Sequence, residues 1–507
     1  MNENVKVVFG LIGGLALFLY GMNSMSDALQ KAAGEKMKKI LEFLTKNPIM
    51  GALAGALVTA VLQSSSATTV MVIGFVSAGL MSLPQAISVI FGANIGTTMT
   101  AQLMAFKISD YIYPLIFIGF MLNFLGKKEK VKNIGMVIFS FGLLFEGIEI
   151  MGSVMKPLAG SPIFVDLMGK VSSVPVLGVV LGAVMTLVVQ SSSATIAVLQ
   201  SFASQAGPDG VNSVIGLAGA IPILLGDNIG TTITALLASI GQSKDAKRTA
   251  IAHSFFNITG TCVFIWIIPW FAQFVRYISP KGNEIDVISR QIANAHTTFN
   301  VVCTLVWLPL IPLMVKIVTT IIRGEDKNTG VVYEPKYLDN KVIDQPVAAM
   351  YLVSQELENL TGFAVHMLNS LKGSLNQKKT SAAYEKFKNQ LDIIQHLQEE
   401  ITDYITKLFS SGNLTELQSE QTAGLLYVTN NIERIADRCQ DIDSIWIKIQ
   451  DDGMSFSEEA GKEIENCINV LLDLLRQAMT AVKQGSEEEA ELVFKNKKKL
   501  HLSLIHI

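Results

Sequence analysis

The sequence feature that most limits the possible folds is the run of residues 49–106, which contains no Asp, Glu, Lys or Arg. A helix needs about 20 apolar residues to cross a bilayer core, so this run has the length of nearly three crossings. Similar apolar windows recur along the first two thirds of the chain, at residues 7–26, 111–126, 133–155, 171–208, 211–243, 249–275 and 291–315. The sequence therefore predicts several membrane-spanning helices.

Charge divides the chain into two parts. Residues 1–323 contain 21 Lys and Arg and 14 Asp and Glu, whereas residues 324–507 contain 19 and 29. We therefore predict a membrane domain over residues 1–323, a linker over 324–343 and a soluble helical domain over 344–507. This division excludes a single soluble enzyme, and we read the N-terminus as a first span and not as a cleaved signal peptide.

Basic loops predict the direction of the spans, because an excess of Lys and Arg marks cytoplasmic loops. The basic loops are residues 27–46, 127–132 and 244–248. They fall on one side only if residues 50–81 and 174–206 form re-entrant hairpins, each returning to the side from which it entered. Each repeat then has three full spans, an odd number, so the second copy is inverted.

A duplication is also visible in the letters of the sequence. QSSSATT at 63–69 recurs as QSSSATI at 190–196, and GANIGTT at 92–98 recurs as GDNIGTT at 226–232. We predict an all-α polytopic membrane domain with two inverted-topology repeats, over about residues 5–126 and 133–275, each containing one re-entrant helical hairpin. An extra span is expected over 291–322. A further likeness, between AHSFFN at 252–257 and AHTTFN at 295–300, does not fit this register.

Each QSSSAT run falls in the middle of a predicted hairpin, where irregular backbone is tolerated only if it lines a cavity or is buried in protein. A helix that begins there offers free N–H groups to an anion, and serine and glutamine side chains add donors. The same oxygens can coordinate Na⁺. Small-residue packing is the alternative for a single run, but two copies favour binding. The predicted anion and cation ligands are Gln63, Ser64, Ser65, Ser66, Thr68, Gln190, Ser191, Ser192, Ser193 and Thr195.

The two G-x-N-I-G-T-T motifs predict a second pair of sites, at breaks in membrane helices, whose oxygens suit Na⁺. The candidate residues are Asn94, Thr97, Thr98, Asn228, Thr231 and Thr232. Close helix packing through Gly and Thr is the alternative. Asp227 in the second copy replaces Ala93 in the first, and an isolated carboxylate inside a membrane is a functional candidate.

The paired QSSSAT and G-x-N-I-G-T-T motifs resemble those of the type II sodium-dependent phosphate cotransporter family, over about residues 5–320. The resemblance implies symport of inorganic phosphate with Na⁺ across the cytoplasmic membrane. Phosphate, Na⁺ and the lipid bilayer are then the partners, with Na⁺ as coupling ion and without nucleic acid, cofactor or catalytic residue; a homodimer is a further expectation. Alternatives are a membrane phosphate sensor and a transporter of another oxyanion.

The polar tail has apolar stripes at helical spacing over 353–371, 387–408 and 425–449, which predict a cytoplasmic antiparallel helix bundle. The tail resembles a PhoU-like domain and is expected to be incomplete, ending in what would be the fifth helix. Glu433 and Asp437 resemble the acidic metal-binding motif of such domains. We predict that they face Glu399 and Asp403 and hold a divalent cation; a solvated, salt-bridged face is the alternative.

Overall fold

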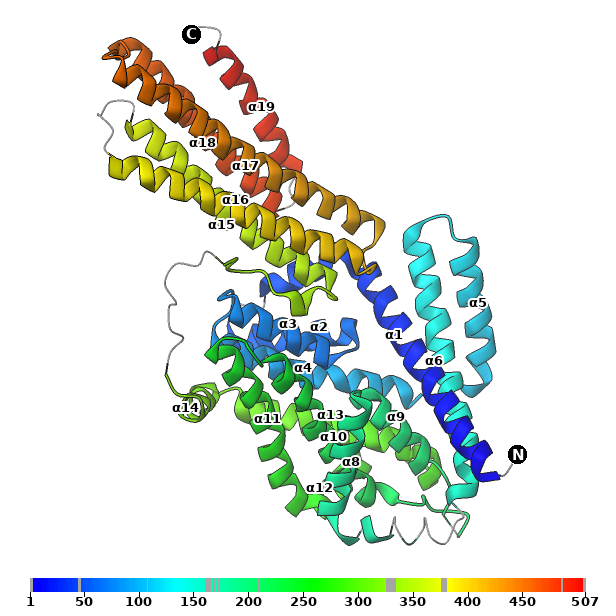
Figure 1. The fold of residues 1–507 in the computed structure, drawn as a ribbon. Helices are drawn as coiled ribbons and strands as arrows, with labels where there is room; N and C mark the ends of the chain where they lie inside the picture. Colours follow the sequence, from blue (N-terminus) through cyan, green and yellow to red (C-terminus); the bar gives the residue numbers. More distant parts are fainter. Residues whose placement is uncertain are drawn as a thin grey trace. The chain divides into compact units, whose positions relative to one another are not determined.

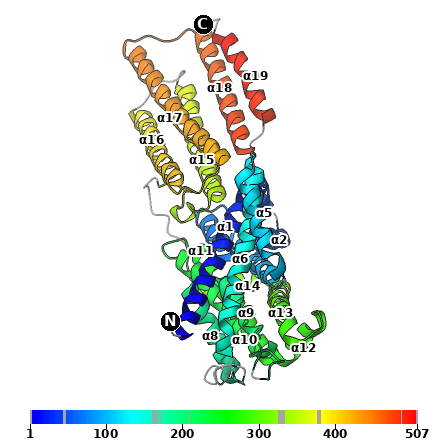
Figure 2. The same ribbon diagram turned by 90° about the vertical axis from the view of Figure 1, so that its right-hand side faces the viewer.

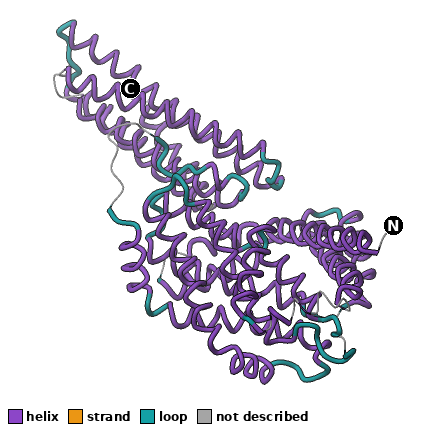
Figure 3. Tube along the Cα trace, turned by 60° about the horizontal axis from the view of Figure 1, so that its bottom comes forward, coloured by secondary structure: helices purple, strands orange, loops and turns teal. Residues whose placement is uncertain are grey.

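The computed structural model consists of helices joined by loops (Figure 3), with one isolated antiparallel bridge between Ala206 and Ser213. It describes residues 3–43, 47–106, 108–159, 166, 169–171, 173–207, 209–324, 334–374, 381–484 and 487–504. Contacts divide the chain into two compact units, Met1–Asp326 and Lys327–Ile507. Within the described residues the all-α prediction is confirmed.

In the first unit, long helices alternate along the chain with shorter ones (Figure 1). Its elements, in chain order, are α1 (Glu3–Phe43), α2 (Pro48–Leu62), α3 (Ser65–Ser77), α4 (Leu83–Met104), η1 (Ser109–Tyr111), α5 (Ile112–Leu125), α6 (Glu129–Ala159), α8 (Pro175–Val189), α9 (Ser192–Ala203), α10 (Gly216–Ala238), α11 (Lys244–Phe264), η2 (Ile265–Ile267), α12 (Ile268–Ile278), α13 (Glu284–Trp307) and α14 (Ile311–Ile321).

Both polar runs interrupt a helix, as the sequence predicts. Gln63 ends α2 and Gln190 ends α8 in the left-handed backbone region, with φ of 51° and 54°. Across the first break, the hydroxyls of Thr59 in α2 and Thr68 in α3 lie 2.9 Å apart. Nine residues of continuous helix span about 13.5 Å, so the chain must reverse between these two threonines. The hairpins are thus formed, while their entry from opposite membrane faces stays a prediction.

Equivalent glycines pack the two repeats in the same way. A Cβ on Gly92 of α4 would lie 1.8 Å from the Ala52 carbonyl oxygen of α2. A Cβ on Gly226 of α10 would lie 2.0 Å from the Val179 carbonyl oxygen of α8. Only glycine allows such an approach of two helix backbones, so α2 packs on α4 and α8 on α10 through matching positions.

Further contacts join the repeats to each other. Helices α1 and α6 lie side by side (Figures 1 and 2), and the backbones of Gly14 and Gly147 approach closely between them. The second arm of each hairpin packs on the long helix of the other repeat, α3 on α10 and α9 on α4. The helix that follows each polar break, α3 or α9, therefore contacts both repeats.

Four helices are long and apolar enough to cross a membrane, or up to six if each sharply bent pair is one span. This estimate covers the described residues only, and it supports a multi-pass membrane protein. The structure adds detail to two of the expected elements. Helix α1 continues to Phe43 through much of the predicted basic loop. The predicted extra span over 291–322 consists of α13 and α14, which are bent by 86°. Pro309 lies at this bend and accounts for it. Proline has no N–H donor, and it disfavours helical backbone at the residue before it.

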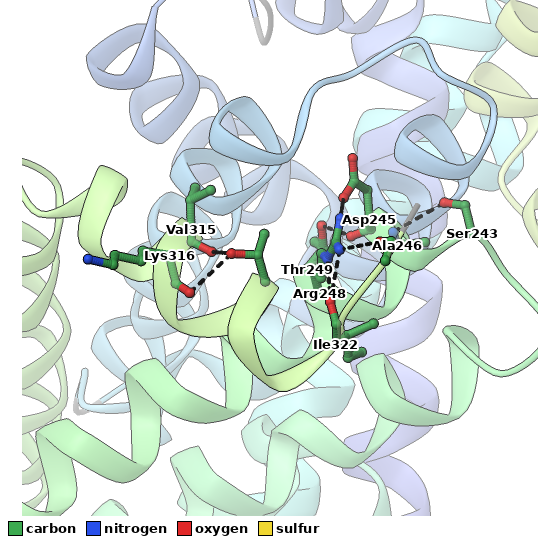
Figure 4. A network of polar contacts seen from close by, with 10 residues as sticks. Ser243, Asp245, Ala246, Arg248, Thr249, Val315, Lys316 and Ile322 are labelled. Carbon is green, nitrogen blue, oxygen red and sulfur yellow. Dashed lines mark hydrogen bonds and ion pairs between the residues drawn. The ribbon is translucent and has the colours of Figure 1, made fainter. Parts of the chain in front are cut away.

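Arg248 fixes the end of the first unit (Figure 4). Ser243 caps α11, and Arg248 in its first turns donates hydrogen bonds of 3.0 and 2.8 Å to the Ile322 carbonyl oxygen, just after α14. It also donates 2.7 Å to Gly324 O and 2.6 Å to Asp245 Oδ1. One guanidinium thus satisfies the carbonyl of Ile322, which caps the C-terminal end of α14, and that of Gly324 just beyond it.

The second unit contains long helices packed around an apolar core. Its elements are η3 (Asn340–Val342), α15 (Pro346–Ser374), α16 (Ser381–Ser410), α17 (Glu416–Asp451), α18 (Glu458–Gln484) and α19 (Glu487–Leu504). Helices α15, α16 and α17 pack on one another, α18 packs on α15, and α19 on α18 (Figure 2). Most predicted stripe residues are buried, although Ile442 of α17 is 46% exposed.

Candidate functional site

The candidate site is built from the first turns of α3 and α9, which follow the two breaks. Ser64 caps α3 by accepting a hydrogen bond of 3.1 Å from Ala67 N, and Ser191 caps α9 by accepting one of 3.2 Å from Ala194 N. The earliest N–H groups of a helix have no acceptor inside it. Each tip thus presents first-turn N–H groups together with serine hydroxyls, a combination suited to an oxyanion.

The two tips differ in their surroundings. Gln63 is buried; its side-chain oxygen accepts a 2.9 Å hydrogen bond from Thr100, and its amide nitrogen donates 2.5 Å to Ala60 O. Gln190 is exposed in the described structure. The repeats thus share a backbone design, but their glutamines stand in different environments.

The first tip also touches the second repeat. Thr234 of α10 donates a 3.2 Å hydrogen bond to the hydroxyl of Ser66. On the other side, Gln200 of α9 donates a 3.2 Å hydrogen bond to Ala101 O of α4. The first tip therefore lies against a helix of the second repeat, and the helix that follows the second tip contacts α4 of the first repeat.

Thr68 and Thr195 hold the arms of the hairpins together and are fully buried. The Thr68 hydroxyl contacts Thr59 at 2.9 Å, and the Thr195 hydroxyl contacts Thr186 at 3.0 Å. Sequence reasoning did not identify Thr59, Thr186, Thr100 or Thr234. The duplication could have identified them. Thr59 and Thr186 are 127 residues apart, like the two QSSSAT runs, and Thr100 and Thr234 are 134 residues apart, like the two G-x-N-I-G-T-T motifs.

The G-x-N-I-G-T-T motifs do not break their helices, so that part of the prediction is wrong. Helices α4 and α10 run through them without interruption, because the glycines serve close packing. All six polar side chains donate to carbonyls of their own helix, three or four residues earlier. These residues are Asn94, Thr97, Thr98, Asn228, Thr231 and Thr232.

The unexplained AHxxFN likeness acquires a structural meaning here. His253 Nε2 lies 3.1 Å from Asn94 Oδ1, and His296 Nε2 lies 3.3 Å from Asn228 Oδ1. Asn300 donates a further 3.3 Å hydrogen bond to Asn228 Oδ1. The two AHxxFN segments therefore occupy equivalent places, one beside the asparagine of each repeat. Because these amide oxygens already have donors, they are less available to a cation.

The four acidic residues predicted to bind metal in the tail are not assembled. Asp403 pairs with Lys407 of its own helix at 2.6 Å, whereas Asp437 accepts a 3.5 Å hydrogen bond from Gln395. Partial burial and then the charge of Asp437 raise the pKa of Glu433. Among the described residues, no group of three or more His, Cys, Asp or Glu side chains is placed to hold a metal ion, so Glu399 and Asp403 do not join Glu433 and Asp437 in one cluster.

Comparison with known families matches both units. The profile of the Na⁺/Pi-cotransporter family matches the chain twice, over residues 17–153 and again over residues 147–278. The profile of the PhoU domain matches residues 357–444. The two matches of the transporter profile reflect the duplication seen in the sequence motifs. The match of the PhoU profile lies in α15–α17.

Three relatives illustrate the similarity. The uncharacterised protein YqeW of Bacillus subtilis is 34% identical over 52% of this chain and 84% of its own length. The putative inorganic phosphate export protein YjbB of Salmonella typhimurium is 25% identical over 97% of this chain and 88% of its own. The sodium-dependent phosphate transport protein 2A of Rattus norvegicus is 37% identical over 19% of this chain and 15% of its own. No solved structure matches the chain.

Proposed function

This chain belongs to the Na⁺/Pi-cotransporter family of membrane phosphate transporters, and from that membership we propose that it moves inorganic phosphate together with Na⁺ across the cytoplasmic membrane. The observation that carries the proposal is the pair of serine-capped helix starts at Ser64 and Ser191, at equivalent positions of two repeats. We propose Gln63 to Ser66 and Gln190 to Ser193 as the ligands of phosphate and Na⁺.

Phosphate fits this pair of tips chemically. Each tip supplies N–H groups at the positive end of a helix dipole, and serine hydroxyls that can donate to tetrahedral oxygens. Charge would still need balancing, because phosphate is anionic and the tips contain no Lys or Arg. Co-bound Na⁺ supplies that charge and prefers the same hydroxyl and carbonyl oxygens, as in other transporters built on broken helices.

The direction of net transport has a second candidate. The Salmonella relative, which matches the tail as well as the repeats, bears the name of a phosphate export protein. Export is therefore the alternative to uptake. We further propose that the PhoU-matching unit is cytoplasmic and regulates flux.

Radiolabelled phosphate flux in a bacterial host lacking its own phosphate transporters tests this function. We expect Na⁺-dependent flux that excess unlabelled phosphate suppresses and sulfate does not. Ser65→Ala and Ser192→Ala should each weaken apparent phosphate affinity about 5- to 150-fold, since an unpaired buried acceptor costs about 1–3 kcal/mol. Phosphate binding without flux would favour a sensor, and wild-type affinity in both variants would remove the serines from the site.

A further inference from the structure

We infer that Asp227, Thr186 and Thr195 form a Na⁺ site that exists in the second repeat only. The inference rests on the proposed function, because it adds one cation site to a Na⁺-coupled transporter. Three elements supply the three side chains: Thr186 comes from α8, Thr195 from α9 and Asp227 from α10. The site thus lies behind the second tip, where both arms of the hairpin meet the long helix of their repeat.

The oxygens of this cluster lie close together. Thr186 Oγ1 donates a 2.5 Å hydrogen bond to Asp227 Oδ1 and lies 3.0 Å from Thr195 Oγ1. Thr195 Oγ1 in turn lies 3.3 Å from the Ser191 carbonyl oxygen, at the broken end of the hairpin. The cluster is therefore made of carboxylate, hydroxyl and carbonyl oxygens, which are the kind of ligand that a hard cation such as Na⁺ prefers.

The carboxylate of Asp227 lacks compensation in the protein alone. The side chain is fully buried, and its Oδ2 atom has no hydrogen-bond partner in the described structure. No Lys or Arg of the described residues forms an ion pair with it. A buried charge that is neither paired nor fully hydrogen-bonded is strongly unfavourable, and inside a membrane domain it marks a functional site. A bound cation would remove this imbalance.

The first repeat provides an internal comparison. There Thr59 and Thr68 make the same hydroxyl contact at 2.9 Å, but Ala93 stands where the second repeat has Asp227. The threonine pair therefore forms without a carboxylate, and Asp227 is an addition to an otherwise shared design. Because Asp227 adds a single negative charge, a monovalent cation neutralises it, whereas a divalent cation would leave a buried positive charge.

Occupancy of this site would bear directly on phosphate. Thr195 lies in the same helix as Ser192 and Ser193, one turn from the N–H groups proposed to receive the anion. A cation between Asp227 and Thr195 would hold α9 against α10 and fix the direction of its first turn. The site thereby links Na⁺ binding to the geometry of the second tip.

Thermal unfolding of the purified full-length protein without phosphate tests the inference. NaCl is titrated against equimolar choline chloride, which separates Na⁺ binding from ionic strength. We expect the wild-type Tm to rise with Na⁺ and to saturate, because a ligand bound only by the folded state stabilises it. Asp227→Asn should lose most of this rise. Thr59→Val, the matched control from the repeat without a carboxylate, should keep it.

Three results would overturn the inference. The first is an equal Na⁺-dependent rise of Tm in Asp227→Asn, and the second is a wild-type Tm that responds to neither Na⁺ nor pH. The third is a wild-type Tm that responds to pH but not to Na⁺, which would assign a proton to the carboxyl. If Asp227→Asn fails to fold, Thr186→Val should raise the Na⁺ concentration for half-maximal shift several-fold, and an unchanged midpoint counts against the site. Flux is measured separately: Na⁺-driven flux without the Tm rise removes only this site, and the Tm rise without Na⁺-driven flux removes only the transport proposal.

Discussion

The hydroxyl of Thr100 donates a 2.9 Å hydrogen bond to the side-chain oxygen of Gln63, joining the long helix α4 to the first hairpin tip. The backbone of Gln63 is left-handed, with φ of 51°, as is that of Gln190 in the second tip. Residues other than glycine enter this region at a cost of about 1–3 kcal/mol and do so mainly at functional sites. The glutamine side chain must therefore provide something that glycine would not.

Replacing Gln63 with glycine distinguishes the role of its left-handed backbone from the role of its side-chain amide. Gln63→Gly relieves the backbone but removes the bond to Thr100, so we expect a folded protein with a Tm close to wild type. Phosphate flux should fall about 5- to 150-fold, since the loss of a buried hydrogen-bonding group costs about 1–3 kcal/mol. Flux and Tm of the purified variant check this. Undiminished flux would mean that the residue serves only the turn.

The helix contact at Gly92 should tolerate no side chain. In Gly92→Ala the new Cβ would meet the Ala52 carbonyl oxygen at 1.8 Å, and that oxygen belongs to helix backbone. We expect a loss of at least about 1–3 kcal/mol in stability, or failure to fold, because α2 would have to move. Gly13→Ala is the control, since nothing lies within 4 Å of its Cβ. Melting curves that match for both variants would refute the close contact.

Much of this architecture follows from the sequence. Polar QSSSAT runs inside charge-free segments predict the two breaks, because unsatisfied backbone must line a site or be buried. The G-x-N-I-G-T-T motifs were harder, because glycine permits both unwinding and close approach, and only the positions of α2 and α8 decide between them. The AHxxFN likeness was visible but uninterpretable, since its partners Asn94 and Asn228 lie far away in sequence.

Inverted topology predicts labelling from opposite sides. Ser82 follows the first hairpin and Gly207 follows the second, so a cysteine at each should react with an impermeant maleimide from the cytoplasmic and the outer side respectively. The native cysteines are first replaced, and intact cells are compared with inverted vesicles. Reaction of both positions from one side would contradict the inversion.

Burial predicts an unreactive thiol in the second unit. Desolvation, followed by the charge of Asp443, raises the pKa of the Cys439 thiol to about 12. Since the thiolate is the reactive form, Cys439 should resist iodoacetamide at about pH 8 in the folded protein. The half-buried Cys467 should react, and both should react after denaturation. Mass spectrometry of labelled peptides checks this, and equal labelling of both in the folded protein would contradict the buried stripe of α17.

The central claim, that phosphate crosses the membrane together with Na⁺, is tested most directly with the purified protein in sealed liposomes. Labelled phosphate is added outside with NaCl or with equimolar choline chloride, over a Na⁺-free interior. The account predicts transient accumulation above the external concentration with NaCl only, abolished by a Na⁺ ionophore. Equal entry in NaCl and choline chloride, with no accumulation in either, would contradict it.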